Sequence, residues 1–312
     1  MADAVIPVAG PMPDASARGG RRVRSRLAYL LEAVKLRIGL EIALTALAGA
    51  ALMPKTPGSG SRIALVTLAV LIASCAAGAY NQYAEADIDA RMKRTRRRPF
   101  VTGAFRADRR WPWMIGLALV AAVLLAAWAA NTAAAGWALL GALTYGVIYT
   151  VWLKRRTWLN IVVGGFAGTF ALLAGAAAVD PRPTPEVTMI GIALFFWTPP
   201  HFWSLALYHK ADYAAAGVPM LPVLIADRAT AVVIAAHVLV VAAASVAAGY
   251  LGLGPVYTAC AVCGSLWFLT AAVRLCLDPT RGRAMSCFRA SLVQLTLLLV
   301  GAIADGIVSG RL

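Results

Sequence analysis

Residues 62–80 read RIALVTLAVLIASCAAGAY, and the chain continues directly into NQYAEADID at 81–89. The first run is apolar and close to the roughly 20 residues that a helix needs to cross the hydrocarbon core of a bilayer. The second run carries two amides and three carboxylates and begins where the apolar run ends. Together they predict a membrane-spanning helix that ends in an acidic cluster.

Similar apolar runs recur along the whole sequence. Of the 312 residues, 61% are hydrophobic and only 14% are charged, a composition that excludes a soluble globular domain of this size. We therefore expect an all-α fold, a polytopic membrane helix bundle with nine transmembrane helices. Their expected ranges are 37–53, 62–80, 111–130, 133–153, 158–179, 187–207, 229–251, 255–275 and 288–308.

The N-terminal segment differs in composition from the rest of the chain. Residues 1–34 hold a Pro, Ala and Gly-rich stretch followed by a basic run, without the apolar core of a signal peptide. We expect a disordered cytosolic tail over 1–34 and one transmembrane domain over 35–312. A Gly-Pro pair at 254–255 and an Asn-Thr pair at 131–132 predict tight turns between neighbouring helices.

Basic residues are distributed unevenly between the loops on the two sides of the predicted bundle. Of the 29 Lys and Arg residues, four (Lys55, Arg62, Arg182 and Arg311) fall on one side and the remaining 25 on the other. Because cytosolic loops retain basic residues, this places the N-terminus and the polar motifs in the cytosol and the C-terminus outside. The net charge of +15 thus indicates membrane orientation and does not predict a nucleic-acid partner.

The acidic cluster has the spacing of a metal site. Asn81, Glu85 and Asp89 are four residues apart, so they lie on one side of a helix. Neighbouring carboxylates repel unless a cation lies between them, and Mg²⁺ prefers oxygen ligands together with substrate phosphate. Arg94 and Arg98, just beyond, suit phosphate oxygens through forked hydrogen bonds. The alternative is an ordinary charged helix end in a cytosolic loop.

A second polar segment begins with WTPPHFW at 197–203. Its paired prolines predict a helix break or kink, which a membrane protein tolerates only beside protein or a cavity, so we expect a cavity near the cytosolic face. His201 is a candidate axial ligand for haem iron, although a lone buried histidine is more often structural. If Lys210 and Asp212 face the acidic cluster, they complete a diphosphate site.

Two smaller features complete the set of candidates. Tyr149 and Lys154 lie near the turn between the expected fourth and fifth spans, where Lys154 is expected to contact phosphate. Cys260 and Cys263 form a CxxC pair inside an apolar run without a companion His or Cys, so they are predicted to pack rather than to bind metal.

These motifs resemble those of a known family. The run NQYAEADIDARMKRTRRRP at 81–99 is similar to the first aspartate-rich motif of UbiA-type intramembrane prenyltransferases, in the form found in protohaem IX farnesyltransferases (haem O synthases). The blocks TPPHFW at 198–203 and KADYAAAGVPMLP at 210–222 resemble the same branch. The resemblance covers roughly residues 35–308. It departs at residues 35–37, where Lys-Leu-Arg replaces a common Lys-Pro-Arg, and at 171–172, where Ala-Leu replaces a usual Pro-Pro.

The resemblance implies a UbiA-like bundle in a bacterial inner membrane that transfers a farnesyl group from farnesyl diphosphate to a vinyl group of haem b. It implies Mg²⁺ as the cofactor, and membrane lipid and a haem A synthase or oxidase assembly factor as partners. The residues that it implies for catalysis are Asn81, Glu85, Asp89, Lys210 and Asp212. Those implied as metal ligands are Asn81, Glu85, Asp89 and Asp212. Those implied for the diphosphate are Arg94, Arg98, Tyr149 and Lys154.

Three other functions fit the same sequence. A related enzyme would prenylate an aromatic or a different tetrapyrrole acceptor with the same diphosphate chemistry. A secondary transporter would also be helical with intramembrane prolines, but it would carry ionisable groups near mid-membrane, whereas here the polar groups gather at one face. An assembly factor for a respiratory oxidase would tolerate substitution of Glu85 and Asp89.

Overall fold

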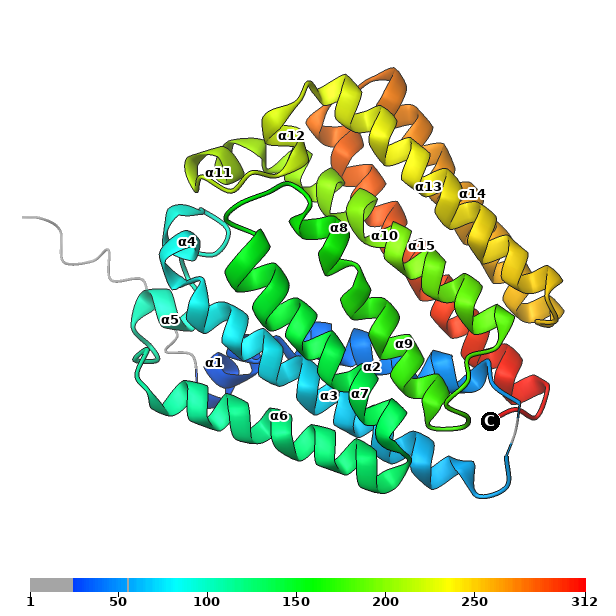
Figure 1. Cartoon of the computed structure of the whole chain (residues 1–312). Coiled ribbons are helices and arrows are strands. Elements are labelled where there is room, and N and C mark those ends of the chain that lie inside the picture. Colours follow the sequence, from blue (N-terminus) through cyan, green and yellow to red (C-terminus); the bar gives the residue numbers. More distant parts are fainter. Residues whose placement is uncertain (1–24, 55) are drawn as a thin grey trace, which may run out of the picture.

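The computed structural model describes residues 25–54 and 56–312, and within these ranges helices joined by loops make up the fold, with no strand. Long helices pack side by side in one bundle, and the short helices α4, α5 and α11 gather at one of its ends (Figure 1). The all-α membrane fold predicted from the sequence is thereby confirmed. Of the expected tail, residues 1–24 lie outside the described ranges, and Arg26–Ala33 forms the helix α1.

The helices follow the apolar runs of the sequence. The first half of the chain forms α2 (Leu36–Ala51), α3 (Ser59–Ala84), α4 (Ala86–Arg91), α5 (Pro99–Thr102), α6 (Arg110–Ala129), α7 (Thr132–Leu143) and the π-helix η2 (Thr144–Leu153). The second half forms α8 (Asn160–Gly164), α9 (Phe166–Ala177), α10 (Pro185–Tyr208), α11 (Lys210–Ala215), α12 (Leu221–Leu224), α13 (Asp227–Tyr250), α14 (Pro255–Leu277) and α15 (Arg281–Val308). Both predicted turns are present, since Asn131 caps α7 and Pro255 begins α14.

The number of spans is the point at which sequence and structure differ. Within the described ranges, eight helices are long and apolar enough to cross a membrane. The segment expected at 37–53 folds as α2, whose 16 residues are fewer than a straight span of the hydrocarbon core requires. The expected count of nine is therefore not confirmed, although a helix forms at every expected position.

Three of the spans are irregular. The fourth changes from α-helix to π-helix at Thr144, and the fifth is interrupted at Gly165, between α8 and α9. At the paired prolines of the sixth span, α10, a break or a kink is expected. The helix is not broken there and continues through Pro199 and Pro200 to Tyr208. Proline lacks an N–H, so the carbonyl of Phe195 has no helical donor at position 199. Gly165, which has no side chain, packs against this Phe195 carbonyl.

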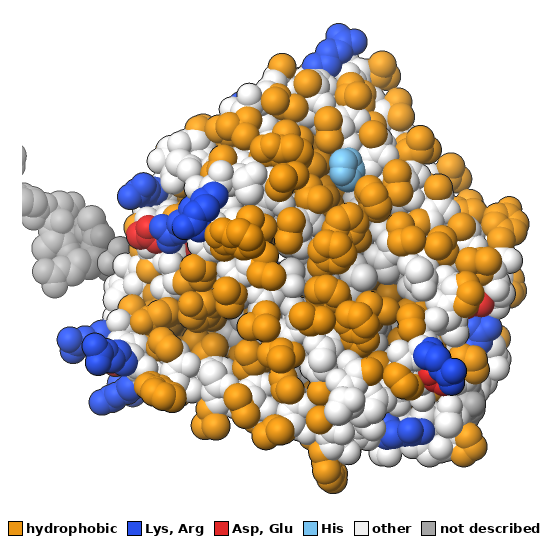
Figure 2. Space-filling view, in the orientation of Figure 1, with side chains coloured by type: hydrophobic (Ala, Val, Ile, Leu, Met, Phe, Trp, Pro, Cys, Tyr) orange, Lys and Arg blue, Asp and Glu red, His pale blue; other side chains and the backbone are white. Residues whose placement is uncertain are grey.

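A buried apolar cluster fixes the end of the bundle that carries the polar motifs. It contains Ile88 and Met92 from the first polar loop and Tyr213 and Met220 from the second, packed around Trp203 of α10. The two loops are therefore held against each other. Elsewhere the surface is that of a membrane protein, because hydrophobic side chains cover the middle of the face in Figure 2 while Lys and Arg lie toward its edges.

Candidate active site

The acidic cluster lies at the junction of α3 and α4. The α-helix ends at Ala84, and Glu85 takes φ −105° and ψ 10°, outside the helical region. The i to i−4 hydrogen bonds nevertheless continue, from Glu85 N to Asn81 O (3.0 Å) and from Asp89 N to Glu85 O (2.8 Å). Asn81, Glu85 and Asp89 therefore keep the one-turn spacing predicted from the sequence. All three are buried, with exposures of 2%, 0% and 2%.

Both the oxygen and the nitrogen of the Asn81 amide form hydrogen bonds. Its Oδ1 accepts a hydrogen bond from Lys35 Nζ, and its Nδ2 donates to Thr150 Oγ1 at 2.8 Å. Lys35 Nζ also donates to the hydroxyl of Tyr145 at 2.8 Å. The three contacts join the break between α1 and α2 to α3 and to the π-helix η2. Because its Nδ2 donates to Thr150, the amide presents its oxygen to the Lys35 ammonium group.

Each carboxylate of the cluster pairs with one basic side chain. Lys154 Nζ donates to Glu85 Oε2 at 2.6 Å, and Arg98 Nη1 donates to Asp89 Oδ2, also at 2.6 Å. The Asp89 loop is closed further by Thr95, whose Oγ1 donates to the Asp89 carbonyl at 3.0 Å. Such short charge-assisted bonds fix both partners in direction as well as position.

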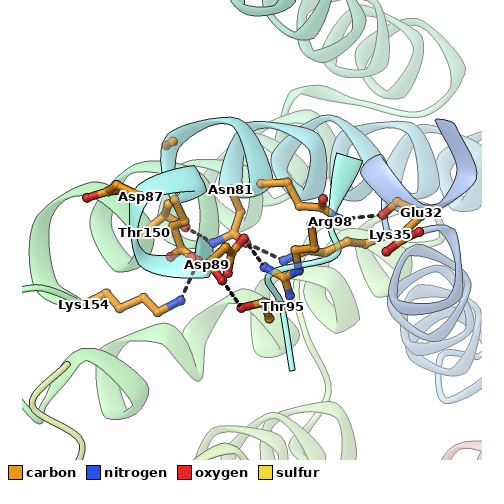
Figure 3. A network of polar contacts seen from close by, with 12 residues as sticks. Glu32, Lys35, Asn81, Asp87, Asp89, Thr95, Arg98, Thr150 and Lys154 are labelled. Atoms are coloured by element: carbon orange, nitrogen blue, oxygen red, sulfur yellow. Dashed lines mark hydrogen bonds and ion pairs between the residues drawn. The ribbon is translucent and has the colours of Figure 1, made fainter. Parts of the chain in front are cut away.

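The polar side chains converge on one point. In Figure 3, Lys35 and Arg98 approach Asn81 and Asp89 from one side, while Lys154 enters from η2 on the other. Burial, followed by the nearby charge of Arg98, lowers the pKa of Lys35 to about 7. The other two basic side chains, Lys154 and Arg98, bring positive charge to the three oxygen-bearing side chains, which suits an anion bound together with a cation.

Asp87 does not belong to this cluster. It points away in Figure 3 and forms a surface pair with Arg155, whose Nη1 and Nη2 donate to its two oxygens at 2.8 Å. The hydrogen bond from Arg155 lowers the pKa of the Asp87 carboxyl. This outward direction follows from helical spacing, because Asp87 lies two residues from both Glu85 and Asp89.

The oxygen atoms of the cluster fit a hard divalent cation. Glu85 Oε1 is buried and has no hydrogen-bond partner, which is costly for a carboxylate unless another cation takes that lone pair. The amide of Asn81 and the carboxylate of Asp89 supply further oxygens of the kind that Mg²⁺ uses. The residues present are thus compatible with Mg²⁺.

The second polar loop lies near the cluster, but its charged residues have their own partners. Lys210 Nζ donates to Asp227 Oδ1 at 2.6 Å, and Asp212 lies 3.8 Å from His209 Nδ1. Over the described residues, no group of three His, Cys, Asp or Glu side chains is placed to hold a metal, so Asp212 does not join Glu85 and Asp89 in this structure.

Arg94 belongs to the first polar loop and lies close enough to the second loop for its charge to act on His209. Burial and then the charge of exposed Arg94 lower the pKa of His209, which follows the last residue of α10. Tyr149 lies on η2 beside the cluster, with Lys154 Nζ 5.4 Å from the centroid of its ring. These two predicted diphosphate residues therefore lie at the same end of the bundle as the carboxylates.

His201 is enclosed by aromatic rings inside the bundle. Trp197 stacks on it with ring centroids 4.3 Å apart, and the Phe288 ring lies at 4.6 Å. Its Nδ1 is 2.7 Å from Ser291 Oγ, and that hydroxyl donates to the Phe288 carbonyl at 2.6 Å. Since the serine proton is engaged, the imidazole donates from Nδ1 and keeps the lone pair on Nε2.

Sequence reasoning did not identify two residues that contact the cluster. Lys35 had only been noted as part of a departure from the family pattern, and Thr150 had not been singled out. Lys35 adopts a left-handed backbone with φ 52°, a conformation that turns the chain between α1 and α2 and that the sequence does not reveal. Thr150 gave no signal, because a threonine in an apolar run usually bonds its own helix backbone.

Comparison with known proteins identifies the family of the chain. The model of the UbiA prenyltransferase family matches residues 42–298. The chain is 48% identical over 286 residues to protoheme IX farnesyltransferase 2 of Paramagnetospirillum magneticum, covering 92% of this chain and 99% of the relative. It is 39% identical over 289 residues to the protoheme IX farnesyltransferase of Thermus thermophilus, of which it covers 46%.

Solved structures show the same fold at low sequence identity. A digeranylgeranylglyceryl phosphate synthase has a TM-score of 0.75 at 16% identity, covering 90% of this chain and 98% of that one. A UbiA homologue from Archaeoglobus fulgidus, bound to GPP and Mg²⁺, has a TM-score of 0.68 at 16% identity, with 88% and 99% covered. From the family match and the extent of identity with its relatives, the chain belongs to the UbiA prenyltransferase family.

Proposed function

We propose that this protein transfers the farnesyl group of farnesyl diphosphate to a vinyl group of haem b. Diphosphate is released and water supplies the hydroxyl group, giving haem O. The observation that carries the proposal is the identity of 48% to a protoheme IX farnesyltransferase over nearly the full length of both chains. The buried cluster of Asn81, Glu85 and Asp89 supports it, because prenyl transfer from a diphosphate needs a site that accepts a metal and a multiply charged anion together.

Asn81, Glu85 and Asp89 would hold Mg²⁺ through their side-chain oxygens. When bound, the ion supplies positive charge that stabilises the diphosphate as it leaves the allylic carbon. Glu85 Oε1 is buried without a hydrogen-bond partner, and a bound Mg²⁺ would provide that partner. The A. fulgidus homologue bound to GPP and Mg²⁺ shows that this fold holds both together in another member of the family.

The basic residues around the cluster would bind the diphosphate oxygens. Lys154 and Arg98 each carry hydrogen-bond donors beyond the one that contacts a carboxylate, so one side chain serves both the acidic ligand and the phosphate. Arg94 and Tyr149 add a guanidinium and a hydroxyl on the side of the second loop. These hydrogen-bond donors are already in place before the reaction, so they stabilise the negative charge that develops on the leaving diphosphate.

Lys210 and Asp212 are proposed as residues of the second loop that reach the diphosphate after it binds. For Lys210 this requires exchange of Asp227 for a phosphate oxygen, since the two side chains are bonded at 2.6 Å. Both residues of that pair are more than one third exposed, so breaking the pair costs little.

His201 is proposed as the haem ligand. The bond from Nδ1 to Ser291 leaves Nε2 as the coordinating atom, and metal-binding histidines usually donate a hydrogen bond from the other ring nitrogen. Titration of the purified protein with haem b should give a Soret shift that His201→Ala abolishes. The same shift in His201→Ala would exclude the ligand role and leave His201 as a packing residue.

The orientation of the protein in the membrane follows from its basic loops. The 25 basic residues on the side of the polar motifs support a site on the cytosolic face of a bacterial inner membrane, with a cytosolic N-terminus. Both substrates are then drawn from that side, and the apolar bundle shields the reacting allylic carbon from premature attack by water.

The direct test is incubation of the purified protein with haem b, farnesyl diphosphate and Mg²⁺, followed by mass analysis of the pigment. The expected product is a hydroxyethylfarnesyl haem, which forms only when all three components are present. Parallel reactions with an aromatic acid as the acceptor separate this function from that of a related prenyltransferase. Prenylation of the aromatic acid with haem b left unchanged would refute the proposal.

A further inference from the structure

A groove away from the active site lies on the outer surface, between α14 and α15, which run side by side (Figure 1). A groove of about 410 Å³ opens between them. Its lining includes Leu266, Trp267, Thr270 and Arg274 from α14, and Arg283 and Ser286 from α15. None of these residues belongs to the active site described above.

Helical spacing separates the groove into an apolar and a basic end. Trp267, Thr270 and Arg274 are three and four residues apart, so they follow one stripe of α14. From Leu266 to Arg274 the helix rises about 12 Å. Leu266 and Trp267 are each 60% exposed, as expected for side chains that face hydrocarbon. The charges therefore lie at the membrane interface and the apolar end runs into the lipid.

The positive charge of the groove is poorly compensated. Among the described residues Arg274 has no ion-pair partner, and Arg283 meets only Asp278, at 3.8 Å, with both side chains about half exposed. A loose, solvated pair of this kind contributes little energy. Two guanidinium groups, one from each helix, thus remain available to bind phosphate oxygens through paired hydrogen bonds.

The basic end of the groove lies at the same end of the bundle as the active site. Arg281, which begins α15, donates from Nε to the Tyr208 carbonyl at 3.1 Å and lies 4.9 Å from the centroid of the Tyr208 ring. Tyr208 is the last residue of α10 and precedes His209 of the second polar loop. The groove thus opens toward the lipid headgroups of the leaflet on the active-site side.

We propose that this groove binds one anionic glycerophospholipid, with its phosphate between Arg274 and Arg283 and an acyl chain along Leu266 and Trp267. A free phosphate ion would leave the apolar end unused, and a zwitterionic headgroup offers the two arginines no net negative charge. The groove thereby differs from the farnesyl and haem sites, which the proposed function places inside the bundle.

The test is native mass spectrometry of the intact chain in detergent, titrated with dioleoylphosphatidylglycerol or dioleoylphosphatidylcholine. We expect one retained phosphatidylglycerol, with the phosphatidylcholine complex roughly tenfold weaker. The double variant Arg274→Gln/Arg283→Gln should weaken phosphatidylglycerol binding by about tenfold or more. Arg106→Gln/Arg109→Gln, which removes two exposed arginines outside the groove, is the matched control and should bind as the unmodified protein does.

A second variant tests the groove without changing its charge. Thr270 is exposed and lines the groove, so Thr270→Trp should fill it and displace the lipid while both arginines remain. Undiminished phosphatidylglycerol binding in Thr270→Trp and in the double arginine variant would overturn the proposal. Equal retention of phosphatidylcholine, or displacement of the lipid by inorganic phosphate, would overturn it as well. Binding is measured without substrates, so the result is independent of farnesyl transfer.

Discussion

Lys154 and Glu85 form a short ion pair in which only one carboxylate oxygen takes part. Lys154 Nζ lies 2.6 Å from Glu85 Oε2, while Oε1 of the same carboxylate is buried without a partner. A buried acid with half of its acceptor capacity unused is poorly explained as a structural ion pair, because a purely structural role leaves the desolvation of Oε1 uncompensated. It is well explained as a ligand that shares its charge between a lysine and a divalent cation.

Glu85→Gln should therefore lower haem O formation by about 10²- to 10³-fold, since it removes charge from the metal site but keeps the shape of the side chain. The remaining activity should need more Mg²⁺ for half-saturation. The measurement is product formation against Mg²⁺ concentration, with size-exclusion chromatography confirming that the variant is folded. Near-normal turnover at low Mg²⁺ would remove Glu85 from the metal site.

Asp87→Asn is the matched control for that experiment. Asp87 lies two residues away on the same short segment, but its carboxylate faces outward and pairs with Arg155. We expect this substitution to leave turnover and the Mg²⁺ requirement unchanged. If Asp87→Asn lowered activity as much as Glu85→Gln does, the separation of the two carboxylates into a buried and a surface group would be wrong.

Lys35→Met tests a residue that sequence reasoning did not place in the site. Lys35 bonds both Asn81 and Tyr145, so its loss should let the amide of Asn81 rotate away from the cluster. A misplaced ligand of this kind costs about ten- to a hundredfold in rate. We expect kcat to fall and the Mg²⁺ requirement to rise, with little change in thermal stability. Arg37→Gln, at an exposed neighbouring position, should behave normally.

The sequence predicted the positions of the helices better than their internal geometry. Apolar length is sufficient to locate a span, and a helix forms at each expected place. The four-residue spacing alone also predicted that Asn81, Glu85 and Asp89 lie on one side of a helix. The change to a π-helix at Thr144 and the break at Glu85 were not predicted, because each depends on partners from other helices. Thr150 on η2 is one such partner, and it meets Asn81 of α3 at 2.8 Å.

The proline pair in α10 is a related case. Pro199 and Pro200 predicted a break or a kink, and of these two the break does not occur, because the helix continues to Tyr208. In water a carbonyl freed by proline would be solvated and the helix would open there. Inside this bundle the freed Phe195 carbonyl lies against Gly165, in protein surroundings of the kind in which a membrane helix tolerates proline.

Asp305→Ala should destabilise the protein without affecting catalysis. Asp305 lies at the opposite end of the bundle, where its buried carboxylate accepts from Gly254 N at 2.9 Å and from Tyr257 N at 3.5 Å. It therefore caps α14 from another helix. Loss of a helix cap costs about 0.5–2 kcal/mol. Thermal unfolding in detergent should show a lower Tm, with Asp305→Asn less affected because an amide oxygen still accepts. An unchanged Tm in Asp305→Ala would show that the cap carries no stability.

Gly175→Ala and Gly168→Ala form a matched pair on α9 with opposite expected effects. A Cβ at Gly175 would lie 1.7 Å from the Ala46 carbonyl of α2, whereas a Cβ at Gly168 would meet nothing within 4 Å. Small residues allow membrane helices to approach closely, so Gly175→Ala should separate α2 from α9 at a cost of about 1–3 kcal/mol. Gly168→Ala should be neutral or gain up to about 1 kcal/mol, because alanine favours the helix. The measurement is the Tm of both variants under the same conditions. Equal Tm shifts would mean that α2 and α9 pack less closely than the structure indicates.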